Sequence, residues 1–301
     1  MPQFIPNYLK TYEHGKLEPK IGQLNKILAH CTLCPRQCRV NRNKDERGFC
    51  GAGKDSRISS VFAHFGEESC LVGRLGSGTI FFSYCNLKCI FCQNYEISHQ
   101  ASGSTITSEK LAAYMLRLQG LGCHNINLVT PTHFIPQILE GLLLAIKQGL
   151  NIPLVYNCGG YESGEVIDML DGVVDIYMPD AKFASAEVSR QFCSVDDYFP
   201  NLKSALKKMY QQVGDLVIDD GIARRGLLVR HLVLPEGLAG TREIMEFIAG
   251  QISRQTYINI MAQYRPCGEA YQFARINCYI TQQEYIEAIR IARSFGLSRF
   301  D

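Results

Sequence analysis

Three cysteines in one short segment have a spacing that suits a metal centre. Cys85, Cys89 and Cys92 lie in SYCNLKCIFCQN with the pattern C-x3-C-x2-C, directly after the apolar run Thr79-Ile80-Phe81-Phe82. Thiolates this close together suit a soft, multinuclear centre such as an iron–sulfur cluster. Because a cubane cluster has four irons, three protein ligands leave one iron open to an outside molecule. An open iron serves a reaction, whereas a structural cluster does not need one.

The same three positions also have a simpler interpretation. Their spacing places them on one face of a helix, where buried cysteines behave as small hydrophobic side chains. Polar residues crowd the same segment, which disfavours an apolar helical stripe: Asn86, Lys88, Gln93 and Asn94. We therefore prefer the cluster interpretation.

A second group of cysteines lies closer to the N-terminus. Its pattern is C-x2-C-x3-C-x11-C, formed by Cys31, Cys34, Cys38 and Cys50. Arginines surround these thiols, and guanidinium groups lower thiolate pKa values and offset ligand charge. They are Arg36, Arg39, Arg42 and Arg47. The spacing suits either a zinc site or a fully ligated auxiliary 4Fe-4S cluster.

Composition limits the class of protein. The chain has 301 residues, and its 31 basic and 29 acidic side chains nearly cancel. This balance disfavours nucleic acid and anionic membranes as partners. Its 13 cysteines are odd in number, and a polar segment follows Met1, so we expect reduced thiols in a cytoplasmic protein rather than disulfides. The longest apolar run, Leu142–Ile146, is far shorter than the ~20 residues of a membrane span.

Short apolar runs alternate with longer amphipathic segments after Gly78. This alternation predicts an α/β fold with a parallel sheet, and six such units would form a partial (β/α)6 TIM-like barrel. A doubly wound sheet fits the periodicity as well. The expected strands are 79–83, 125–130, 153–157, 173–178, 226–234 and 256–261. The expected helices are 108–119, 136–148, 164–170, 185–213, 242–251 and 282–294, the last with Thr281 and Glu284 in capping-box spacing. We expect residues 1–74 to form an N-terminal extension that carries the four-cysteine group, and residues 75–301 to form the barrel.

Polar or glycine-rich residues follow most of the expected strands. In a parallel barrel, chemistry gathers at the carboxyl ends of the strands. Each loop by itself is also explained by ordinary turn chemistry, but the repetition favours a shared site. The loops are Thr130-Pro131-Thr132-His133, Asn157-Cys158-Gly159-Gly160, Met178-Pro179-Asp180-Ala181-Lys182, Arg230-His231 and Gln263-Tyr264.

The cysteine loop and its surroundings resemble a known superfamily. The stretch GSGTIFFSYCNLKCIFCQNYEIS is similar to the radical S-adenosylmethionine (radical SAM) enzymes, and specifically to uncharacterised relatives of pyruvate formate-lyase activating enzyme. The similarity extends from about Cys31 to the C-terminus. It implies the partial barrel, a 4Fe-4S cluster, and SAM chelated to the open iron. Reductive cleavage of SAM then gives methionine and a 5′-deoxyadenosyl radical that abstracts hydrogen, with flavodoxin or ferredoxin as the usual electron donor.

The resemblance also implies roles for individual residues. Met178, Asp180 and Lys182 match a Met-x-Asp-x-Lys motif whose Asp and Lys lie near the methionine moiety of SAM. Phe91 precedes the third cysteine, at a position whose surroundings pack near adenine.

Two departures from the family pattern affect the expected SAM site. Asn157 and Cys158 stand where the family often has Asp-Thr beside a monovalent cation, and the loss of a carboxylate places that cation site in doubt. A Gly-Gly-Glu motif that holds the SAM amino group is replaced by the segment containing Thr130 and Thr132. Threonine hydroxyls still accept hydrogen bonds from an ammonium group.

The remaining candidates are assigned from their place in the chain. We expect His133, His231, Gln263 and Tyr264 on the substrate side, with an ordinary residue at a helix N-terminus as the alternative for His133. His64, Glu67 and Glu68 either line the cavity or form a solvated loop. The isolated cysteines are expected to be small buried hydrophobic residues: Cys70, Cys123, Cys193, Cys267 and Cys278.

The source of the abstracted hydrogen stays open. One version activates a glycyl radical enzyme by taking hydrogen from a backbone glycine, and another modifies a small molecule or a protein side chain. The alternative of another class is a non-catalytic iron–sulfur or zinc scaffold, which needs neither an open iron nor the Asp180–Lys182 loop. A tRNA-modifying enzyme is disfavoured by the charge balance, because RNA binding usually leaves a basic surface.

Overall fold

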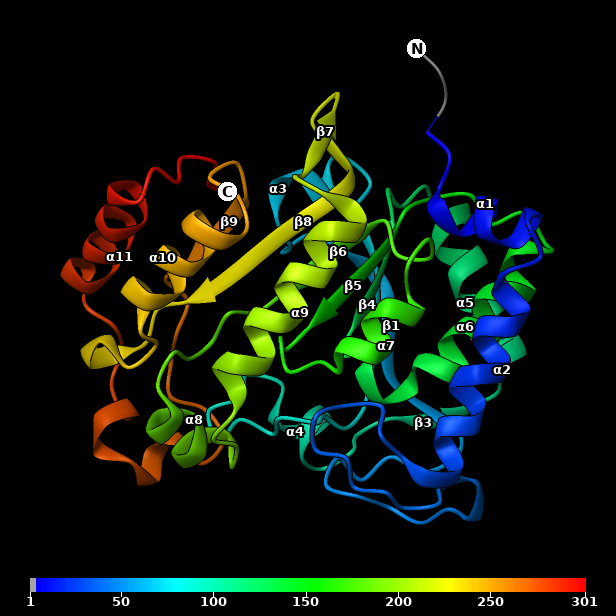
Figure 1. Ribbon diagram of the computed structural model, residues 1–301, viewed down its shortest axis with the longest axis horizontal. Coiled ribbons are helices and arrows are strands. Elements are labelled where there is room, and N and C mark those ends of the chain that lie inside the picture. Colours follow the sequence, from blue (N-terminus) through cyan, green and yellow to red (C-terminus); the bar gives the residue numbers. More distant parts are fainter. Residues whose placement is uncertain (1–3) are drawn as a thin grey trace.

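A nine-stranded sheet forms the centre of the computed structural model, which describes residues 4–301 (Figure 1). Its order is β3-β1-β2-β4-β5-β6-β8-β7, with β9 paired to β8. The strands are β1 (Ser56–His64), β2 (Ser77–Phe82), β3 (Ser104–Ile106), β4 (Ile126–Val129), β5 (Leu154–Cys158), β6 (Ile176–Pro179), β7 (Val217–Asp219), β8 (Ile222–Leu232) and β9 (Tyr257–Met261).

Helices cover the outside of the sheet. In Figure 1, α2, α5 and α6 lie on one side, α7 and α9 cross the front, and α10 and α11 lie at the far edge. The helices are α1 (Asn7–Glu13), α2 (Leu17–Ile27), α3 (Ser69–Val72), α4 (Tyr95–Ser98), α5 (Ser108–Gly120), α6 (Ile135–Ile146), α7 (Gly164–Met169), α8 (Ala186–Cys193), α9 (Tyr198–Val213), α10 (Thr241–Gln251) and α11 (Gln282–Ser294).

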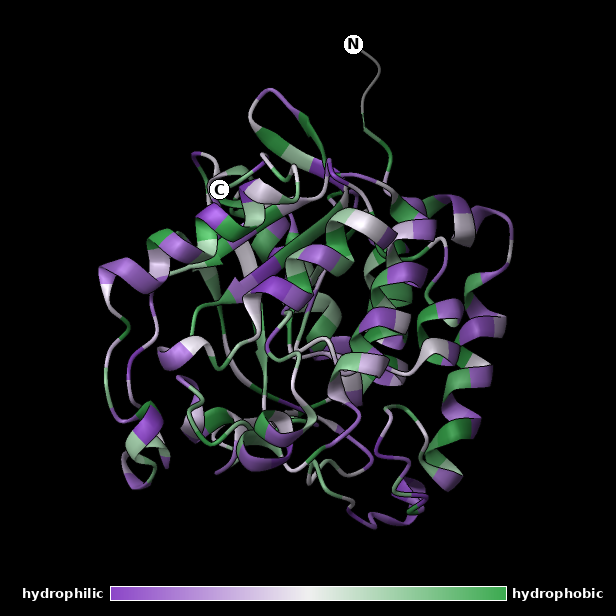
Figure 2. Ribbon diagram, turned by 60° about the vertical axis from the view of Figure 1, so that its left-hand side comes forward, coloured by the Kyte–Doolittle hydropathy of each residue, from purple (hydrophilic) through white to green (hydrophobic). Residues whose placement is uncertain are grey.

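The parallel part of the sheet confirms the predicted α/β fold. β2, β4, β5, β6, β8 and β9 pair in parallel in that order. The sheet stays open, so it is a partial barrel. Every residue of β4 and β5 is buried, as expected for strands covered on both faces. Figure 2 shows the same pattern, with hydrophobic residues on the central strands and hydrophilic residues on the outer helices.

Antiparallel strands extend this parallel core. β1 pairs with β2 and β3, and β7 pairs with β8, all in antiparallel orientation. The sequence analysis did not predict β1, β3 or β7. Because β1 ends at His64, the sheet begins within the segment that the sequence predicts as an N-terminal extension.

The expected helix 185–213 is wrong in one respect. It is interrupted after Cys193, where Ser194 has a left-handed backbone with φ of 55°. A second helix begins at Tyr198. A non-glycine residue in this conformation ends a helix, and the break turns Cys193 toward the cysteine loop. The expected strand 173–178 begins only at Ile176. By contrast, α11 starts with the predicted capping box of Thr281 and Glu284.

The N-terminal helices were not predicted, and they close one side of the barrel. α2 packs against α6, and the Asn7 N–H donates to the buried carboxylate of Asp175 at 2.7 Å. α6 is the most apolar helix but has 12 residues. Within residues 4–301, no helix is long and apolar enough to cross a membrane.

Candidate metal and cofactor site

The cysteine loop follows β2 at the carboxyl end of the sheet. Residues 83–92 are not helical, so the interpretation as an apolar helical stripe is wrong. Tyr84 and Lys88 adopt left-handed backbone conformations, with φ of 72° and 49°, which let the loop fold back on itself. The Leu87 N–H points at the Cys85 sulfur at 3.4 Å. Backbone donors of this kind stabilise a thiolate.

The loop and the strand ends enclose one cavity of about 230 Å³, which we call the barrel cavity. All three loop cysteines line it. So do Phe91 of the cysteine loop and six polar residues predicted at the strand ends: Thr130, Asn157, Asp180, Lys182, Arg230 and Gln263. The three cysteines and several charged and amide side chains therefore line the same cavity, which is large enough to hold a bound group.

A compact charged network lies on one wall of this cavity. The Lys182 ammonium contacts the Asp180 carboxylate at 2.6 Å, and Arg230 Nε contacts its other oxygen at 2.8 Å. Burial raises the pKa of Asp180, but the neighbouring Arg230 and Lys182 lower it by more, so the carboxyl stays ionised. Burial likewise lowers the pKa of Lys182, and Asp180 more than reverses that shift. The two residues face the same way, as their spacing in the sequence predicts.

Arg230 extends this network to the neighbouring strand. Its Nη2 donates to Asn157 Oδ1 at 2.8 Å, and its Nη1 contacts Glu67 at 3.4 Å. A guanidinium therefore bridges Asp180 and Asn157, the residue whose missing carboxylate places the cation site in doubt. Sequence reasoning noted Arg230 only as part of a strand end. The available signal was a permanent cation within the largely apolar expected strand 226–234.

Comparison with known proteins agrees with this geometry. Residues 79–219 match the family described as the Radical SAM superfamily. An uncharacterised protein of Methanocaldococcus jannaschii, MJ0674, is 34% identical over 300 residues, covering 97% of this chain and 82% of that protein. The chain belongs to the radical SAM superfamily. Membership implies a 4Fe-4S cluster, SAM as a partner, a reductant and SAM-dependent radical chemistry.

Two solved structures align with part of the chain. A domain of a pyruvate-formate lyase-activating enzyme from Bacteroides vulgatus aligns with a TM-score of 0.36 at 16% identity, covering 64% of this chain and 89% of that domain. Methylornithine synthase aligns with a TM-score of 0.47 at 16% identity, covering 70% of this chain and 59% of that one.

The barrel cavity fits the cluster that the superfamily implies. Three thiols from one loop line it. Burial raises the pKa of the Cys85 and Cys92 thiols, whereas the pKa of Cys89 is lowered. A hydrogen bond from Cys193 is the largest cause and outweighs the effect of burial, and the charge of Lys182 adds to it. In residues 4–301, no three His, Cys, Asp or Glu side chains converge closely enough to hold a single metal ion. A cubane distributes its thiolates over different irons, so its ligands need not converge on one point.

Cys193 is a residue whose place the sequence did not reveal. Its Sγ lies 3.2 Å from the Sγ of Cys89, although it was expected to be only a small hydrophobic residue. Cys70 and Cys123 are buried as expected, whereas Cys267 is half-buried and Cys278 is exposed.

Four of the predicted site residues lie outside the barrel cavity, and three of them are buried behind its wall. Thr132 is fully buried and donates to Glu162 Oε1 at 2.8 Å, so its hydroxyl does not face a ligand. His231 is also fully buried, and its ring nitrogens contact the Ala181 carbonyl and Thr241 Oγ1. The Tyr264 hydroxyl donates to the Ile276 carbonyl at 2.6 Å, while its ring packs against Phe91. These side chains support the cavity wall instead.

Glu162 is a buried carboxyl behind that wall. It accepts hydrogen bonds from Thr132 and from the Tyr156 hydroxyl, each at 2.8 Å. Burial raises its pKa from 4.5 to about 7, although both hydrogen bonds oppose the shift.

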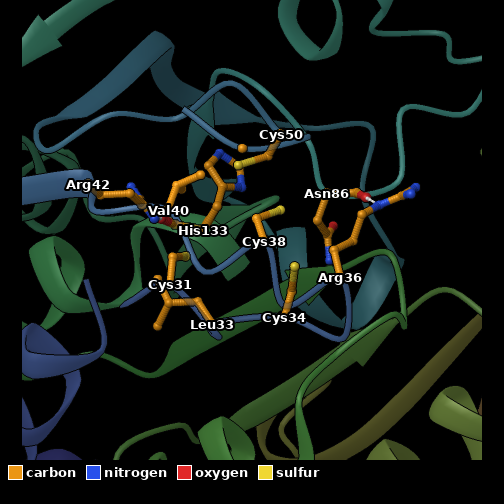
Figure 3. A pocket seen from close by; sticks show the side chains of 11 residues that line it. Cys31, Leu33, Cys34, Arg36, Cys38, Val40, Arg42, Cys50, Asn86 and His133 are labelled. Carbon is orange, nitrogen blue, oxygen red and sulfur yellow. Dashed lines mark hydrogen bonds between the residues drawn. The ribbon is translucent and has the colours of Figure 1, made fainter. Parts of the chain in front are cut away.

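The four N-terminal cysteines line a pocket of their own, of about 20 Å³ (Figure 3). We call it the N-terminal pocket. The Phe49 N–H points at the Cys38 sulfur at 3.4 Å, and the Ala52 N–H points at the Cys50 sulfur at 3.5 Å. Of the surrounding arginines, Arg36 and Arg42 line this pocket. The grouping of Cys31, Cys34, Cys38 and Cys50 therefore agrees with the sequence prediction of one thiol-rich site.

His133 lies in this N-terminal pocket and does not line the barrel cavity. His133 is 2% exposed, and its Nε2 contacts the Ser83 carbonyl at 2.7 Å. Burial is the main cause that lowers its pKa to about 3. The predicted placement on the substrate side is thus corrected, because the short helix at Thr132–Phe134 turns the ring away from the strand ends.

Arg36 joins the N-terminal pocket to the barrel. Its guanidinium donates to the carbonyls of Asn86 and Cys193, each at 2.7 Å. Both carbonyls belong to the surroundings of the cysteine loop, so the two thiol groups are parts of one connected structure.

Proposed function

We propose that Cys85, Cys89 and Cys92 hold a 4Fe-4S cluster in the barrel cavity, with SAM on the iron that they leave open. The observation that supports this is a single cavity of about 230 Å³ lined by three loop thiols and by strand-end polar groups. When bound, the cluster and SAM supply reductive cleavage to methionine and a 5′-deoxyadenosyl radical, with an electron from flavodoxin or ferredoxin. The chain orients SAM and keeps water away from the radical.

The residues around the cavity would have distinct tasks. Lys182 would donate to the SAM carboxylate, as a charge-assisted hydrogen bond. Asn157 and Thr130 offer polar atoms for the remaining groups of the amino-acid moiety. Phe91 is 4% exposed and is held by edge-to-face contacts with Phe183 and other rings, so it gives adenine a rigid apolar neighbour.

Arg230 would act as a built-in cation. Its guanidinium contacts Asn157 Oδ1 and Asp180 Oδ1, both at 2.8 Å. These oxygens are the groups that would otherwise face a monovalent cation, and a fixed guanidinium satisfies both of them. We therefore propose that SAM binds here without an added metal cation.

The first candidate reaction is activation of a glycyl radical enzyme, by abstraction of hydrogen from a backbone glycine. What supports it is the resemblance of the segment 76–98 to relatives of pyruvate formate-lyase activating enzyme. The work would take place in the cytoplasm, where thiols stay reduced. A protein substrate must bring its glycine to the open side of the partial barrel.

A second candidate, modification of a small amine, is favoured by one observation. A polar cavity of about 480 Å³ shares Arg230 and Gln263 with the barrel cavity. Glu68 also lines it and is 2% exposed, and its Oε2 has no hydrogen-bond partner within residues 4–301. A buried carboxylate oxygen without a partner costs free energy, and an ammonium group on a substrate would satisfy it.

The N-terminal pocket completes the proposal. Its four cysteines would hold a second metal centre, either zinc or an auxiliary 4Fe-4S cluster, within an extension that comprises residues 1–74. All four thiols line one pocket, and backbone N–H groups point at two of them. Such a centre contributes folding free energy.

The size of the substrate can be tested directly. Extract of the source organism would first be separated by ultrafiltration into a macromolecular and a small-molecule fraction. Each fraction would then be mixed anaerobically with the reconstituted protein, SAM and reductant. An activase predicts that only the macromolecular fraction raises 5′-deoxyadenosine formation and gains a glycyl radical signal in electron paramagnetic resonance. Stimulation by the small-molecule fraction alone would replace the activase with the second candidate.

A further inference from the structure

A buried imidazole shares the N-terminal pocket with four thiols. His133 lines the pocket together with Cys31, Cys34, Cys38 and Cys50. The histidine comes from the loop after β4, about eighty residues beyond the last of these cysteines. Figure 3 shows its ring among the cysteine side chains, on the side of Cys50. The fold therefore brings a fifth candidate ligand to the thiols.

The hydrogen bond of the ring defines which nitrogen is free. Nε2 lies 2.7 Å from the Ser83 carbonyl oxygen, and because a carbonyl only accepts, Nε2 must carry the proton. In a neutral imidazole, Nδ1 then bears the lone pair. That nitrogen is buried and has no hydrogen-bond partner within residues 4–301. Buried polar atoms without a partner are uncommon in folded proteins, and this one faces a pocket lined by thiols, where a further group can use its lone pair.

The nearest cation does not supply that group. The Arg42 guanidinium donates to the His133 carbonyl through Nη1 and to the Gly53 carbonyl through Nε and Nη2. It holds the backbone of His133 in place and does not hydrogen-bond to the ring. A metal ion or cluster would accept the lone pair of Nδ1, since a histidine ligand commonly donates its other N–H to a backbone carbonyl.

We propose that His133 binds, through Nδ1, the metal centre that the N-terminal cysteines hold. The centre is of the class that takes thiolate and imidazole ligands together. Because no three such donors in residues 4–301 converge on one point, an iron–sulfur cluster, whose ligands bind different irons, fits better than a single Zn²⁺ ion. Five donors exceed the four positions of a tetrahedral ion or a cubane. His133 would therefore replace one of the four cysteines in the ligand set proposed above.

This ligand connects the second centre to the first. The Ser83 carbonyl, which accepts from Nε2, lies two residues before Cys85, and two residues span at most about 7 Å. Metal binding at Nδ1 fixes the ring and, through Nε2, the start of the cysteine loop. The inference rests on the proposed second centre but not on the radical chemistry in the barrel cavity.

The test uses the full chain with Cys85, Cys89 and Cys92 all changed to Ala, so that the remaining metal is at the N-terminal pocket. One sample receives iron and sulfide anaerobically, and another receives Zn²⁺, which distinguishes the two metals by content. Nitrogen ligation is measured by pulsed electron paramagnetic resonance for a reduced cluster and by X-ray absorption for zinc. The proposal predicts a nitrogen ligand in this background, with a changed hyperfine coupling when the histidines carry ¹⁵N.

A substitution gives the second measurement. His133→Gln keeps an N–H that can reach the Ser83 carbonyl but lacks the Nδ1 lone pair. It should lose the nitrogen signal and at least tenfold in metal affinity, while His231→Gln, a buried histidine outside the pocket, should keep both. Circular dichroism establishes that each variant is folded, and ¹⁵N labelling needs no substitution. A shell of sulfur alone, a chain that retains no metal, or a His133→Gln protein with unchanged affinity would each overturn the proposal.

Discussion

The Sγ atom of Cys193 lies 3.2 Å from the Sγ of Cys89, the middle cysteine of the cluster loop. Both side chains are buried, at 2% and 7% exposure. In a protein that lacks its cluster, the two sulfurs need to approach by only about 1 Å to reach the 2.03–2.05 Å length of a disulfide bond. Dissolved oxygen would take one hydrogen from each thiol and be reduced to hydrogen peroxide, and the two sulfurs would form one S–S bond.

We therefore expect aerobically purified, iron-free protein to contain a Cys89–Cys193 disulfide and to resist cluster reconstitution until it is reduced. Mass spectrometry of an unreduced digest would show the linked peptides. Cys193→Ala should abolish the link and allow reconstitution without a reductant, whereas Cys123→Ala should behave as the wild type. An equal need for reductant in the Cys193 variant would contradict this expectation.

Lys182 tests the assignment of the SAM carboxylate. Lys182→Met keeps the apolar stem and removes the ammonium that lines the barrel cavity. SAM binding should weaken by about 1.5–3 kcal/mol, the scale of a hydrogen bond to a charged group, or roughly 10- to 150-fold in Kd. Anaerobic equilibrium dialysis at equal iron content measures this change. Lys147→Met, at an exposed position, is the control, and equal affinities in the two variants would remove Lys182 from the site.

Arg230 predicts how SAM binding responds to monovalent cations. Because its guanidinium already contacts Asn157 and Asp180, the Kd for SAM should be the same in potassium, sodium or tetramethylammonium chloride at equal ionic strength. Isothermal titration with reconstituted protein measures it. A tenfold gain specific to potassium or sodium would show that a cation site exists beside the guanidinium.

Glu162 predicts a pH dependence of stability. Its pKa in the folded chain is about 7, against 4.5 when unfolded, so the folded state binds the proton more tightly. Protonation of Glu162 stabilises the fold fully below pH 4.5, and this stabilisation is lost as the pH rises through 7. It contributes on the order of 3 kcal/mol at most to the free energy of unfolding. Glu162→Gln should flatten this part of the slope in anaerobic denaturant titrations. An identical slope in the variant and the wild type would exclude Glu162 as its source.

Local patterns in the sequence predicted what depends on neighbours along the chain. The alternation of apolar runs gave the six parallel strands, and the capping box placed the start of α11 at Gln282. The sequence likewise predicted that the cysteines of each group lie together and that Asp180 and Lys182 face the same way. Each of these groups lies within one short segment of the chain.

What the sequence did not reveal depends on contacts across the barrel. Cys193 meets Cys89 across 104 residues, and Arg230 meets Asp180 across 50. The orientation of His133 depends on a short helix that brings its ring to a pocket formed by the N-terminal segment. The amphipathic pattern of residues 185–213 continues through Ser194, so it hid the break that positions Cys193.

The central claim is that the barrel loop holds a cluster that cleaves SAM. The most direct measurement is anaerobic reconstitution, followed by dithionite and SAM, with chromatographic analysis of the products. We predict about four irons at the barrel loop, together with 5′-deoxyadenosine and methionine in the wild type. Cys85→Ala, Cys89→Ala and Cys92→Ala should each abolish both products. Cleavage at the wild-type rate in any of these three variants would contradict the account.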